Sequence, residues 1–355
     1  MRRFWQAPFT VDAVIPDADA DDFRVLLHRS WHPVAVAAEV VPDAPARATL
    51  LGQPLLLLRS DDGVHAYTDV CVHRGAQVSL GRMDDGRVRC PFHGWAYDPV
   101  TGGCVEIPSQ PGRPVPSKAQ LTGHHCVEHV GLVWVSLDEP VVPMPEFPEF
   151  DDDRFRVVVC PPYDWDCHAS RRVENFLDFA HFAWVHPGTL GDRDFPEVPE
   201  HEVWQDGDRI RIRQPRPEPR NDSVKTGGLD GDAEHTDDGR VMSVMHYVGY
   251  PPLAAQLRQE LPAGREYAVF LAASPIDDHT TRTFWHVART YAWDQPDDEF
   301  VQFQVEVVAQ DRPIVESQRP EQIPAEITAE LHVGDDKVSL AWRRLLRDLV
   351  DRATA

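Results

Sequence analysis

Two short segments in the first third of the chain each pair a thiol with an imidazole. Residues 71–73 read Cys-Val-His and, after sixteen intervening residues, 90–93 read Cys-Pro-Phe-His. A glycine follows each segment closely, which favours the tight loops that ligands at this spacing need. Sulfur and imidazole nitrogen can bind a structural zinc ion, or a 2Fe–2S cluster in which one iron takes both sulfurs and the other both nitrogens. The predicted ligands are Cys71, His73, Cys90 and His93.

A second group of ligand-type side chains lies in the sequence ENFLDFAHFAWVH, which begins at Glu174. A helix over 171–186 would place Glu174, Asp178 and His181 on one polar face. His181 and His186 are five residues apart, or about 140° on a regular helix, so the second imidazole requires a widened turn or the end of the helix. Two imidazoles and one carboxylate form the facial ligand set of non-heme Fe(II) oxygenases.

The residues around the first two segments resemble a known family. The sequence CVHRGAQVSLGRMDDGRVRCPFHGWAYDPVTGGCVEIP, at 71–108, closely resembles the Rieske domain of bacterial aromatic-ring-hydroxylating oxygenases. The resemblance implies a 2Fe–2S Rieske cluster, rather than zinc, on the two thiols and two imidazoles. Trp95 either shields this cluster or packs in the core.

The Asp-x-x-His-x4-His arrangement resembles the catalytic domain of the same oxygenases. This resemblance implies a mononuclear Fe(II) bound by His181, His186 and a carboxylate far downstream. The best match for the third ligand is Asp311, and the alternatives are Glu306 and Glu316.

Two further residues have roles that the resemblance implies. Asp178 is expected to hydrogen-bond His181 of its own chain and a cluster histidine of the neighbouring subunit, for which His93 is the candidate. Such a carboxylate orients the imidazoles and links the two metals. Asn175 is expected to lie near the iron.

Two C-terminal segments, QDRPIVESQ at 310–318 and RRLL at 343–346, resemble the branch that contains vanillate and dicamba O-demethylases. Members of that branch are mostly monooxygenases and homotrimers. The expected function is the oxygenase component of a multi-component Rieske monooxygenase, which inserts one atom of O2 into an organic substrate by hydroxylation or oxidative O- or N-demethylation. Because the sequence contains no flavin or nicotinamide motif, electrons are expected from an NAD(P)H-dependent reductase, with or without a ferredoxin. A cis-dihydroxylating ring dioxygenase and a Rieske electron-transfer protein without catalysis remain as alternatives.

Composition limits the partners and the location of the protein. The formal net charge is −23, which opposes binding to nucleic acid or to an anionic membrane. No apolar run reaches the roughly 18 residues of a membrane helix, and the N-terminal residues do not resemble a secretory signal, so a cytoplasmic location is expected. Of the six cysteines, the four outside the two segments are expected to be small buried side chains.

The sequence has 355 residues, and its patterns predict helices and strands that together form an α+β fold. After an N-terminal segment (1–28), short apolar runs between turn signals predict an all-β Rieske 2Fe–2S domain over 29–140. A proline-rich stretch then leads into a mononuclear iron catalytic domain over 141–355. This domain is expected to be helix-grip-like, with helices at 171–186, 299–316 and 339–352 flanking antiparallel strands at 202–214, 241–250, 265–273 and 281–292.

The sequence does not identify the substrate. The pocket is expected to be lined by residues from 198–250, 270–285 and the helix at 299–316. The polar segment 216–239 is expected to be a mobile loop that caps it. His246 and His286 lie in predicted strands and are candidates for the pocket wall.

Overall fold

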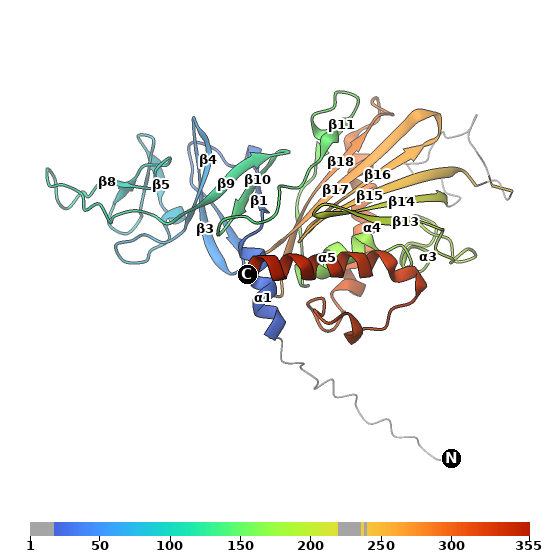
Figure 1. Cartoon of the computed structure of the whole chain (residues 1–355). Coiled ribbons are helices and arrows are strands. Elements are labelled where there is room, and N and C mark those ends of the chain that lie inside the picture. The colour runs from blue at the N-terminus through green and yellow to red at the C-terminus, as the bar shows by residue number, and fades with distance from the viewer. Residues whose placement is uncertain (1–17, 219–235, 238–239) are drawn as a thin grey trace, which may run out of the picture.

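The chain folds into an N-terminal β region and a C-terminal sheet covered by helices (Figure 1). The computed structural model describes residues 18–218, 236–237 and 240–355. All the strand pairs in these residues are antiparallel. The architecture confirms the predicted α+β class, in which an all-β unit precedes an antiparallel sheet flanked by helices.

The N-terminal region is built on a six-stranded sheet in the order β1-β10-β9-β4-β3-β2, preceded by helix α1 (Ala18–His28). Its strands are β1 (His32–Val36), β2 (Ala46–Leu50), β3 (Gln53–Ser60), β4 (Gly63–Thr68), β9 (Gly123–His129) and β10 (Leu132–Ser136). The four consecutive leucines of β3 are all fully buried, although successive side chains of a strand point to opposite faces. Leu55 and Leu57 join the core shared with the C-terminal domain, and Leu56 and Leu58 join a smaller core. This sheet is therefore covered on both faces at β3.

A four-stranded sheet is inserted between β4 and β9, in the order β5-β6-β7-β8. Its strands are β5 (Arg82–Asp84), β6 (Arg87–Arg89), β7 (Ala96–Tyr97) and β8 (Cys104–Glu106). The first Cys-x-His segment lies just after β4, and the second Cys-x-x-His segment lies between β6 and β7. Both segments are therefore held in loops of this insertion.

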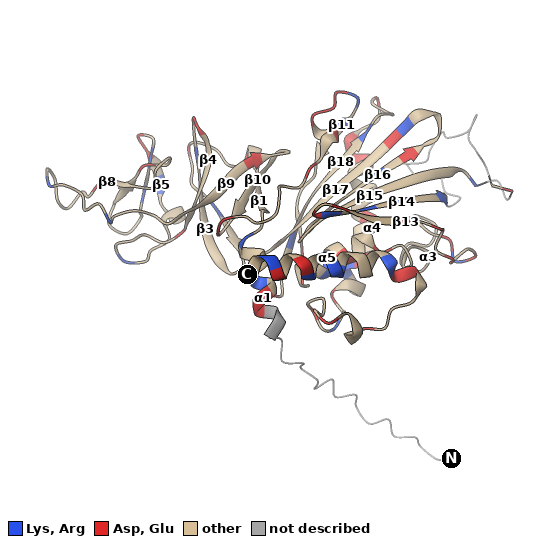
Figure 2. Cartoon of the chain, in the orientation of Figure 1, with Lys and Arg blue, Asp and Glu red and all other residues tan. Residues whose placement is uncertain are grey.

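The C-terminal domain is built on an eight-stranded sheet in the order β11-β18-β17-β16-β15-β14-β13, with β12 also paired to β18. Its strands are β11 (Arg156–Val159), β12 (Tyr163–Trp165), β13 (Glu202–Asp206), β14 (Arg209–Pro217), β15 (Met242–Tyr250), β16 (Ala254–Leu261), β17 (Arg265–Pro275) and β18 (Thr281–Arg289). Strand β15 carries no Lys, Arg, Asp or Glu, whereas β14 carries four arginines and α5 carries charges of both signs (Figure 2).

Helices α2 (Ala169–Leu177), α4 (Asp297–Val315) and α5 (Lys337–Thr354) pack with this sheet and with one another. The indole of Trp342 on α5 lies so close to β15 that a Cβ at Gly249 would be 2.9 Å from its Cζ3 atom. The same Cβ would be 2.8 Å from Cγ1 of Ile210. Glycine at 249 therefore permits α5 to lie flat on the sheet.

Several predicted elements differ from the structure. The strand predicted at 202–214 is a hairpin of β13 and β14, because Gly207 adopts a positive φ of 60° and turns the chain. Strand β16 was not predicted because its sequence AAQLRQEL has polar residues on both faces. The loop predicted at 216–239 begins too early, since β14 continues to Pro217. Most of that segment, at 219–235 and 238–239, lies outside the described residues.

In the described part of the chain, no helix has the length and apolar character that a membrane crossing requires.

Candidate metal centres and the cavity beside them

The predicted helix over 171–186 is interrupted where the ligand residues begin. Helix α2 ends at Leu177, and Asp178 is extended, with φ −86° and ψ 142°. A single helical turn, α3 (Phe182–Val185), follows, with His181 immediately before it and His186 immediately after it. The expected distortion between the two imidazoles is present. The expected polar helix face of Glu174, Asp178 and His181 is wrong, because α2 has already ended at Asp178.

Glu174 belongs to a different cluster. Its carboxylate accepts hydrogen bonds from Arg343 on α5, with Nε–Oε1 at 2.6 Å, and from Arg171, with Nη1–Oε2 at 3.2 Å. Arg171 and Arg343 also both bond Glu330. These four buried or half-buried charges therefore satisfy one another and join α2 to α5.

Three ligand-type side chains converge between α2, α3 and α4. The ligand atoms of His181, His186 and Asp311 all lie within 4.8 Å of one another. The Nε2 atoms of His181 and His186 are 3.5 Å and 3.0 Å from Oδ1 of Asp311. The His186 Nε2 atom is buried and makes no hydrogen bond of acceptable geometry, which is costly for a polar atom unless something else binds it. The donor set and its spacing fit an Fe(II) ion with open coordination positions.

Asp311 is ionised in this setting. Burial alone would favour its neutral form, but the nearby imidazole of His186, followed by that of His181, holds the pKa of its carboxyl below the usual value. The alternative carboxylates lie elsewhere. Glu306 accepts a hydrogen bond from Gln302 on the exposed side of α4, and Glu316 bonds Arg312 and the backbone of Asp166.

The orientation of each imidazole is fixed by a side-chain oxygen close to its Nδ1 atom, the ring nitrogen that faces away from Asp311. The Nδ1 atom of His181 lies 3.2 Å from Oδ2 of Asp178, and the Nδ1 atom of His186 lies 2.7 Å from Oε1 of Gln310. Because both oxygens accept hydrogen bonds, Nδ1 carries a proton in each ring, and Nε2 is the nitrogen that faces Asp311. Gln310 was not predicted; its position next to Asp311 was the only signal in the sequence.

Asn175 lies beside the same group of side chains. Its Nδ2 atom donates to Oδ1 of Asp311 at 3.3 Å, and its Oδ1 atom accepts from Nη1 of Arg172 at 3.0 Å. Asn175 therefore connects α2 to the carboxylate on α4. Arg172 was not predicted to belong to the site.

The two Cys/His segments form matching loops. The amide of Gly75 donates to the carbonyl of Cys71, and the amide of Gly94 donates to that of Cys90. Both glycines have a positive φ, 74° and 71°, which most side chains avoid. Sequence and backbone therefore repeat the same turn twice.

The four side chains of these loops lie in two pairs rather than around one point. The buried thiols of Cys71 and Cys90 interact with each other, and the rings of His73 and His93 have centroids 4.6 Å apart. Among the residues that the structure describes, the ligand atoms that gather around one point are those of His181, His186 and Asp311, and not those of these two loops. Pairing of sulfur with sulfur and nitrogen with nitrogen fits a two-iron cluster and does not fit tetrahedral zinc.

Two aromatic residues contact the paired ligands. The hydroxyl of Tyr97 lies 3.1 Å from Sγ of Cys71, and the indole of Trp95 stacks on His73 with centroids 4.5 Å apart and planes 8° apart. Trp95 is half-buried, so it both packs against the small core and covers one face of His73. Among the remaining cysteines, Cys104, Cys160 and Cys167 are buried, and Cys126 is half-buried.

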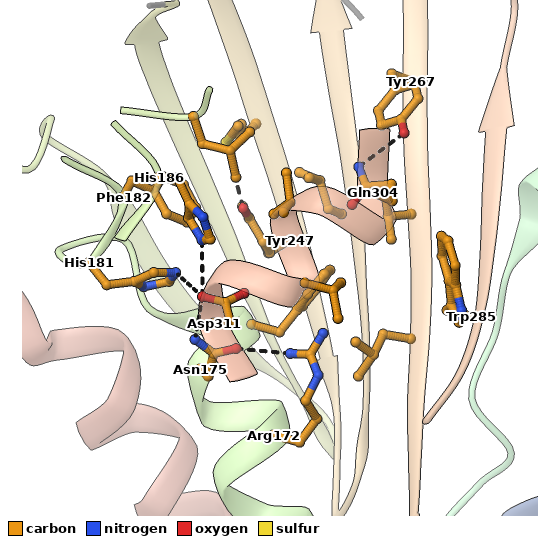
Figure 3. A pocket seen from close by; sticks show the side chains of 18 of the residues that line it. Arg172, Asn175, His181, Phe182, His186, Tyr247, Tyr267, Trp285, Gln304 and Asp311 are labelled. Atoms are coloured by element: carbon orange, nitrogen blue, oxygen red, sulfur yellow. Dashed lines mark hydrogen bonds and ion pairs between the residues drawn. The ribbon is translucent and has the colours of Figure 1, made fainter. Parts of the chain in front are cut away.

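A cavity opens beside His181, His186 and Asp311 (Figure 3). Much of its wall is apolar or aromatic, and it includes Phe176, Phe182, Leu190, Met245, Tyr247, Leu257, Tyr267, Val269, Leu271, Trp285, Val307 and Val308. Gln304 on α4 donates to the hydroxyl of Tyr267 at 3.0 Å. The wall draws on β15, β17, β18 and α4, as expected from the sequence.

The two histidines considered for the pocket wall lie outside it. His286 is fully buried and bonds the carbonyl of Val130 at 2.7 Å, among the rings of Phe147, Phe150 and Phe270. His246 points to the other face of β15, where its Nε2 atom lies 3.1 Å from a carboxylate oxygen of Glu260.

Both parts of the chain match known protein families. Residues 30–122 match the Rieske [2Fe-2S] domain, and residues 165–352 match the vanillate O-demethylase oxygenase C-terminal domain. The methylxanthine N1-demethylase NdmA of Pseudomonas putida is 34% identical over 337 residues, which cover 93% of this chain and 91% of that protein. A stretch of 111 residues is 35% identical to the oxidoreductase NdmD of the same bacterium, over 31% of this chain and 19% of that protein.

Solved structures agree with these matches. NdmA with caffeine, from Pseudomonas putida CBB5, superimposes with a TM-score of 0.82 at 34% identity over 93% of each chain. Dicamba monooxygenase bound to dicamba shares the fold, with a TM-score of 0.78 at 22% identity, over 92% of this chain and 98% of that one.

Proposed function

The chain belongs to the Rieske non-heme iron oxygenases, in the branch that shares the vanillate O-demethylase catalytic domain, and on that premise we propose that it is an oxidative demethylase. As a Rieske monooxygenase it uses a 2Fe–2S Rieske cluster and a mononuclear iron. The proposed substrate is a small flat molecule with a methyl group on nitrogen or oxygen.

The proposed reaction consumes one O2, two electrons and two protons. One oxygen atom enters a C–H bond of the methyl group, and the other leaves as water. The resulting hydroxymethyl group then breaks its bond to nitrogen or oxygen, which takes up a proton, and carbon leaves as formaldehyde. A separate reductase supplies the electrons, since NdmA-type relatives are accompanied by an oxidoreductase, NdmD, in the same bacterium.

One observation carries the proposal: the cavity with aromatic walls ends at the three converging ligand-type side chains (Figure 3). In the proposal His181, His186 and Asp311 hold the mononuclear iron. Iron bound there would supply the activation of O2. Rings such as Phe182 and Trp285 hold a flat substrate beside that position and exclude bulk water, because they leave few polar atoms to solvate.

The surrounding residues keep the ligands in place. Asp178 and Gln310 fix the two rings with Nε2 directed inward, and Asn175 donates to the carboxylate of Asp311. The low pKa of Asp311 keeps it ionised and able to bind a cation throughout the neutral range. We assign Asp178 and Asn175 to the catalytic machinery in this sense.

At the other centre, Cys71 and Cys90 would bind one iron of the cluster, and His73 and His93 the other. The hydroxyl of Tyr97 would donate to the Cys71 sulfur and stabilise the electron-rich, reduced form. Stacking of Trp95 covers His73 from solvent.

Electron transfer between the two centres is proposed to cross a subunit boundary. The inserted sheet β5–β8 and helices α3 and α4 lie toward opposite sides of the molecule (Figure 1). Apolar residues are exposed near both, including Val72 and Phe92 beside the cluster loops, and Ile314 and Leu331 near Asp178. A homotrimer arranged head to tail would cover them and bring Asp178 to the partner subunit's His93.

We further place the domain boundaries at 29–140 for the Rieske domain and 141–355 for the catalytic domain. We propose a cytoplasmic location, since the six cysteines are all unpaired and a reducing compartment keeps thiols in that state.

Turnover of the purified holoenzyme with NAD(P)H, a generic reductase and a panel of methylxanthines, other N-methyl heterocycles and aryl methyl ethers tests the proposal. One formaldehyde is expected for each molecule of demethylated product, and that product should carry no oxygen atom from labelled O2. Asp311→Ala should abolish turnover, whereas Glu306→Ala, an exposed carboxylate of the same helix, should retain it. A cis-diol product carrying both labelled atoms would overturn demethylation.

A further inference from the structure

Arg172 is a buried cation in the wall of the active-site cavity. It is 2% exposed and lies on α2, one turn before Asn175. Figure 3 shows its guanidinium on the cavity side of the helix, near Asp311 and Asn175. A charge removed from water in this way requires compensation by an anion or by hydrogen bonds.

The hydrogen bonds and ring contacts of Arg172 are all with neutral groups. Its Nε and Nη2 atoms donate to the hydroxyl of Tyr163 at 3.0 Å and 2.8 Å, and its Nη1 atom donates to the amide oxygen of Asn175. Its guanidinium carbon lies 4.7 Å from the ring centroid of Trp165. A guanidinium has five N–H donors, so one donor on each of its two terminal nitrogens is left over.

The neighbouring arginines differ. Arg171 and Arg343, which are equally buried, each pair with the carboxylates of Glu174 and Glu330. No carboxylate of the described residues lies within 4.0 Å of Arg172 in an ion pair. Arg289, which is also buried, pairs with Asp297. Arg172 differs from these three arginines because its one acidic neighbour in the cavity, Asp311, interacts with it at longer range.

The cavity as a whole also has an excess of positive charge once iron is bound. Among the described residues that line it, Asp311 is the one acid and Arg172 the one arginine. In the proposed function Asp311 binds a doubly charged iron, whose positive charge exceeds the single negative charge of the carboxylate. The cavity with iron bound therefore carries a net positive charge in a setting of low polarity, where unpaired charge is most costly.

From these contacts we infer that Arg172 recognises an anionic group of the substrate and that this enzyme acts on small aromatic molecules bearing a carboxylate. A planar carboxylate matches the two remaining terminal N–H groups, and aromatic walls fit the ring that carries it. The inference rests on the proposed function for the position of the iron. It also separates this chain from NdmA, whose solved complex holds the uncharged molecule caffeine.

Matched acid and amide ligands test this inference without turnover. Binding of benzoate, 4-methoxybenzoate and indole-3-carboxylate to the anaerobic holoenzyme is compared by calorimetry with binding of the corresponding primary amides. Because a hydrogen bond to a charged group is worth one to two factors of ten in affinity, the acids should bind about ten- to a hundredfold more tightly than their amides. If no acid binds more tightly than its amide, the inference is overturned.

Variants assign the preference to Arg172. Arg172→Met should remove the preference for acids, and Arg172→Gln, which keeps an uncharged hydrogen-bond donor at this position, should remove it as well. Gln304→Leu, an uncharged change in the same wall, should alter the affinity for an acid and its amide equally and so keep their ratio. A preference that survives in both Arg172 variants contradicts the inference.

Iron content distinguishes recognition from a purely structural role. If both Arg172 variants lose the mononuclear iron, Arg172 serves to hold Asp311 and the inference is overturned. The inference and the proposed function also fail separately. Formaldehyde from uncharged N-methyl compounds, without any preference for acids, refutes only the inference. Preference for acids, without formaldehyde from any methylated compound, refutes only demethylation.

Discussion

The side-chain oxygen of Gln310 lies 2.7 Å from Nδ1 of His186, while the next residue along α4, Asp311, lies 3.0 Å from Nε2 of the same ring. Consecutive residues of one helix thus contact both nitrogens of one imidazole. The ring is held in one orientation, with Nε2 on the side of Asp311.

Loss of this contact should weaken the mononuclear iron. Gln310→Leu leaves His186 Nδ1 without an acceptor, and loss of such an orienting bond typically reduces metal affinity by about ten- to a hundredfold. Metal analysis after dialysis against a mild chelator should show less iron per chain, with the visible spectrum of the cluster intact. Gln302→Leu, at an exposed position of the same helix, is the control and should retain its iron. Equal iron retention in both variants would contradict the role of Gln310.

Asp178 should affect communication between the centres more than their assembly. Its carboxylate bonds His181, and its pKa stays below the usual value because that bond and the charge of His181 outweigh the effect of burial. Asp178→Asn is nearly isosteric but lacks the charge, so cluster and iron should both remain. Re-oxidation of the pre-reduced cluster by O2 with substrate, followed by stopped flow, should be at least about tenfold slower. Re-oxidation at the wild-type rate would refute the proposed route through Asp178.

The reduction potential of the cluster should depend on Tyr97. The hydroxyl that lies 3.1 Å from Cys71 Sγ favours the reduced form, because reduction adds negative charge to the sulfur ligands. A hydrogen bond worth about 1 kcal/mol corresponds to a few tens of millivolts for a one-electron couple, so Tyr97→Phe should lower the potential by about that amount. Tyr67→Phe is the control, because the Tyr67 hydroxyl bonds the carbonyls of Pro99 and Val100 instead. An unchanged potential in Tyr97→Phe would show that the hydroxyl does not reach the bound cluster.

Acid should destabilise the fold partly through His168, which precedes α2 and caps it. Its Nδ1 atom accepts from the amide of Ser170 at 3.2 Å, so the ring must be neutral. Burial, with a smaller contribution from Arg171, lowers the pKa of His168 to about 4, against the opposing charges of Asp278 and Glu321. Between this value and the ordinary pKa of 6.5, the unfolded chain binds more protons than the folded one.

The contribution of His168 to stability is therefore complete above pH 6.5 and is lost as the pH falls toward 4, for a total of about 3 kcal/mol. His168→Asn keeps an acceptor for the Ser170 amide and removes the titration. Urea unfolding at several pH values should give a shallower acid loss for this variant than for the wild type. His32, whose pKa burial also lowers to about 4, is present in both proteins and cancels in the comparison. Parallel curves would contradict the prediction.

The metal centres could be predicted from the sequence because most of their ligands lie in short segments with characteristic residue types and spacing. The Cys-x-His and Cys-x-x-His loops and the His-x4-His spacing indicated both centres, since residue types and spacing alone restrict the metals they can bind. The end of α3 at Val185, just before His186, agrees with the widened turn or helix end expected from the 140° between His181 and His186. Sequence reasoning missed the earlier end of α2, because Asp178 has no local signal that ends a helix.

Several side-chain contacts of the site could not be predicted from the sequence. Gln310 joins the site through His186, 124 positions away. Arg172 bonds Asn175 one turn along its own helix, but arginine at that spacing is common on surfaces and carried no signal. Glu174 was grouped with the ligands because its partners, Arg343 and Glu330, lie far along the chain. Gly207 turned one predicted strand into a hairpin, a change that alternating polar and apolar residues on both sides concealed.

The most direct test of the two-centre account is the iron and acid-labile sulfide content of purified holoenzyme beside that of Asp311→Ala. The wild type should contain three irons and two sulfides per chain, and the variant two of each, with the red-brown cluster spectrum unchanged. A wild type with only two irons, or a variant that keeps all three, would contradict a separate iron at His181, His186 and Asp311.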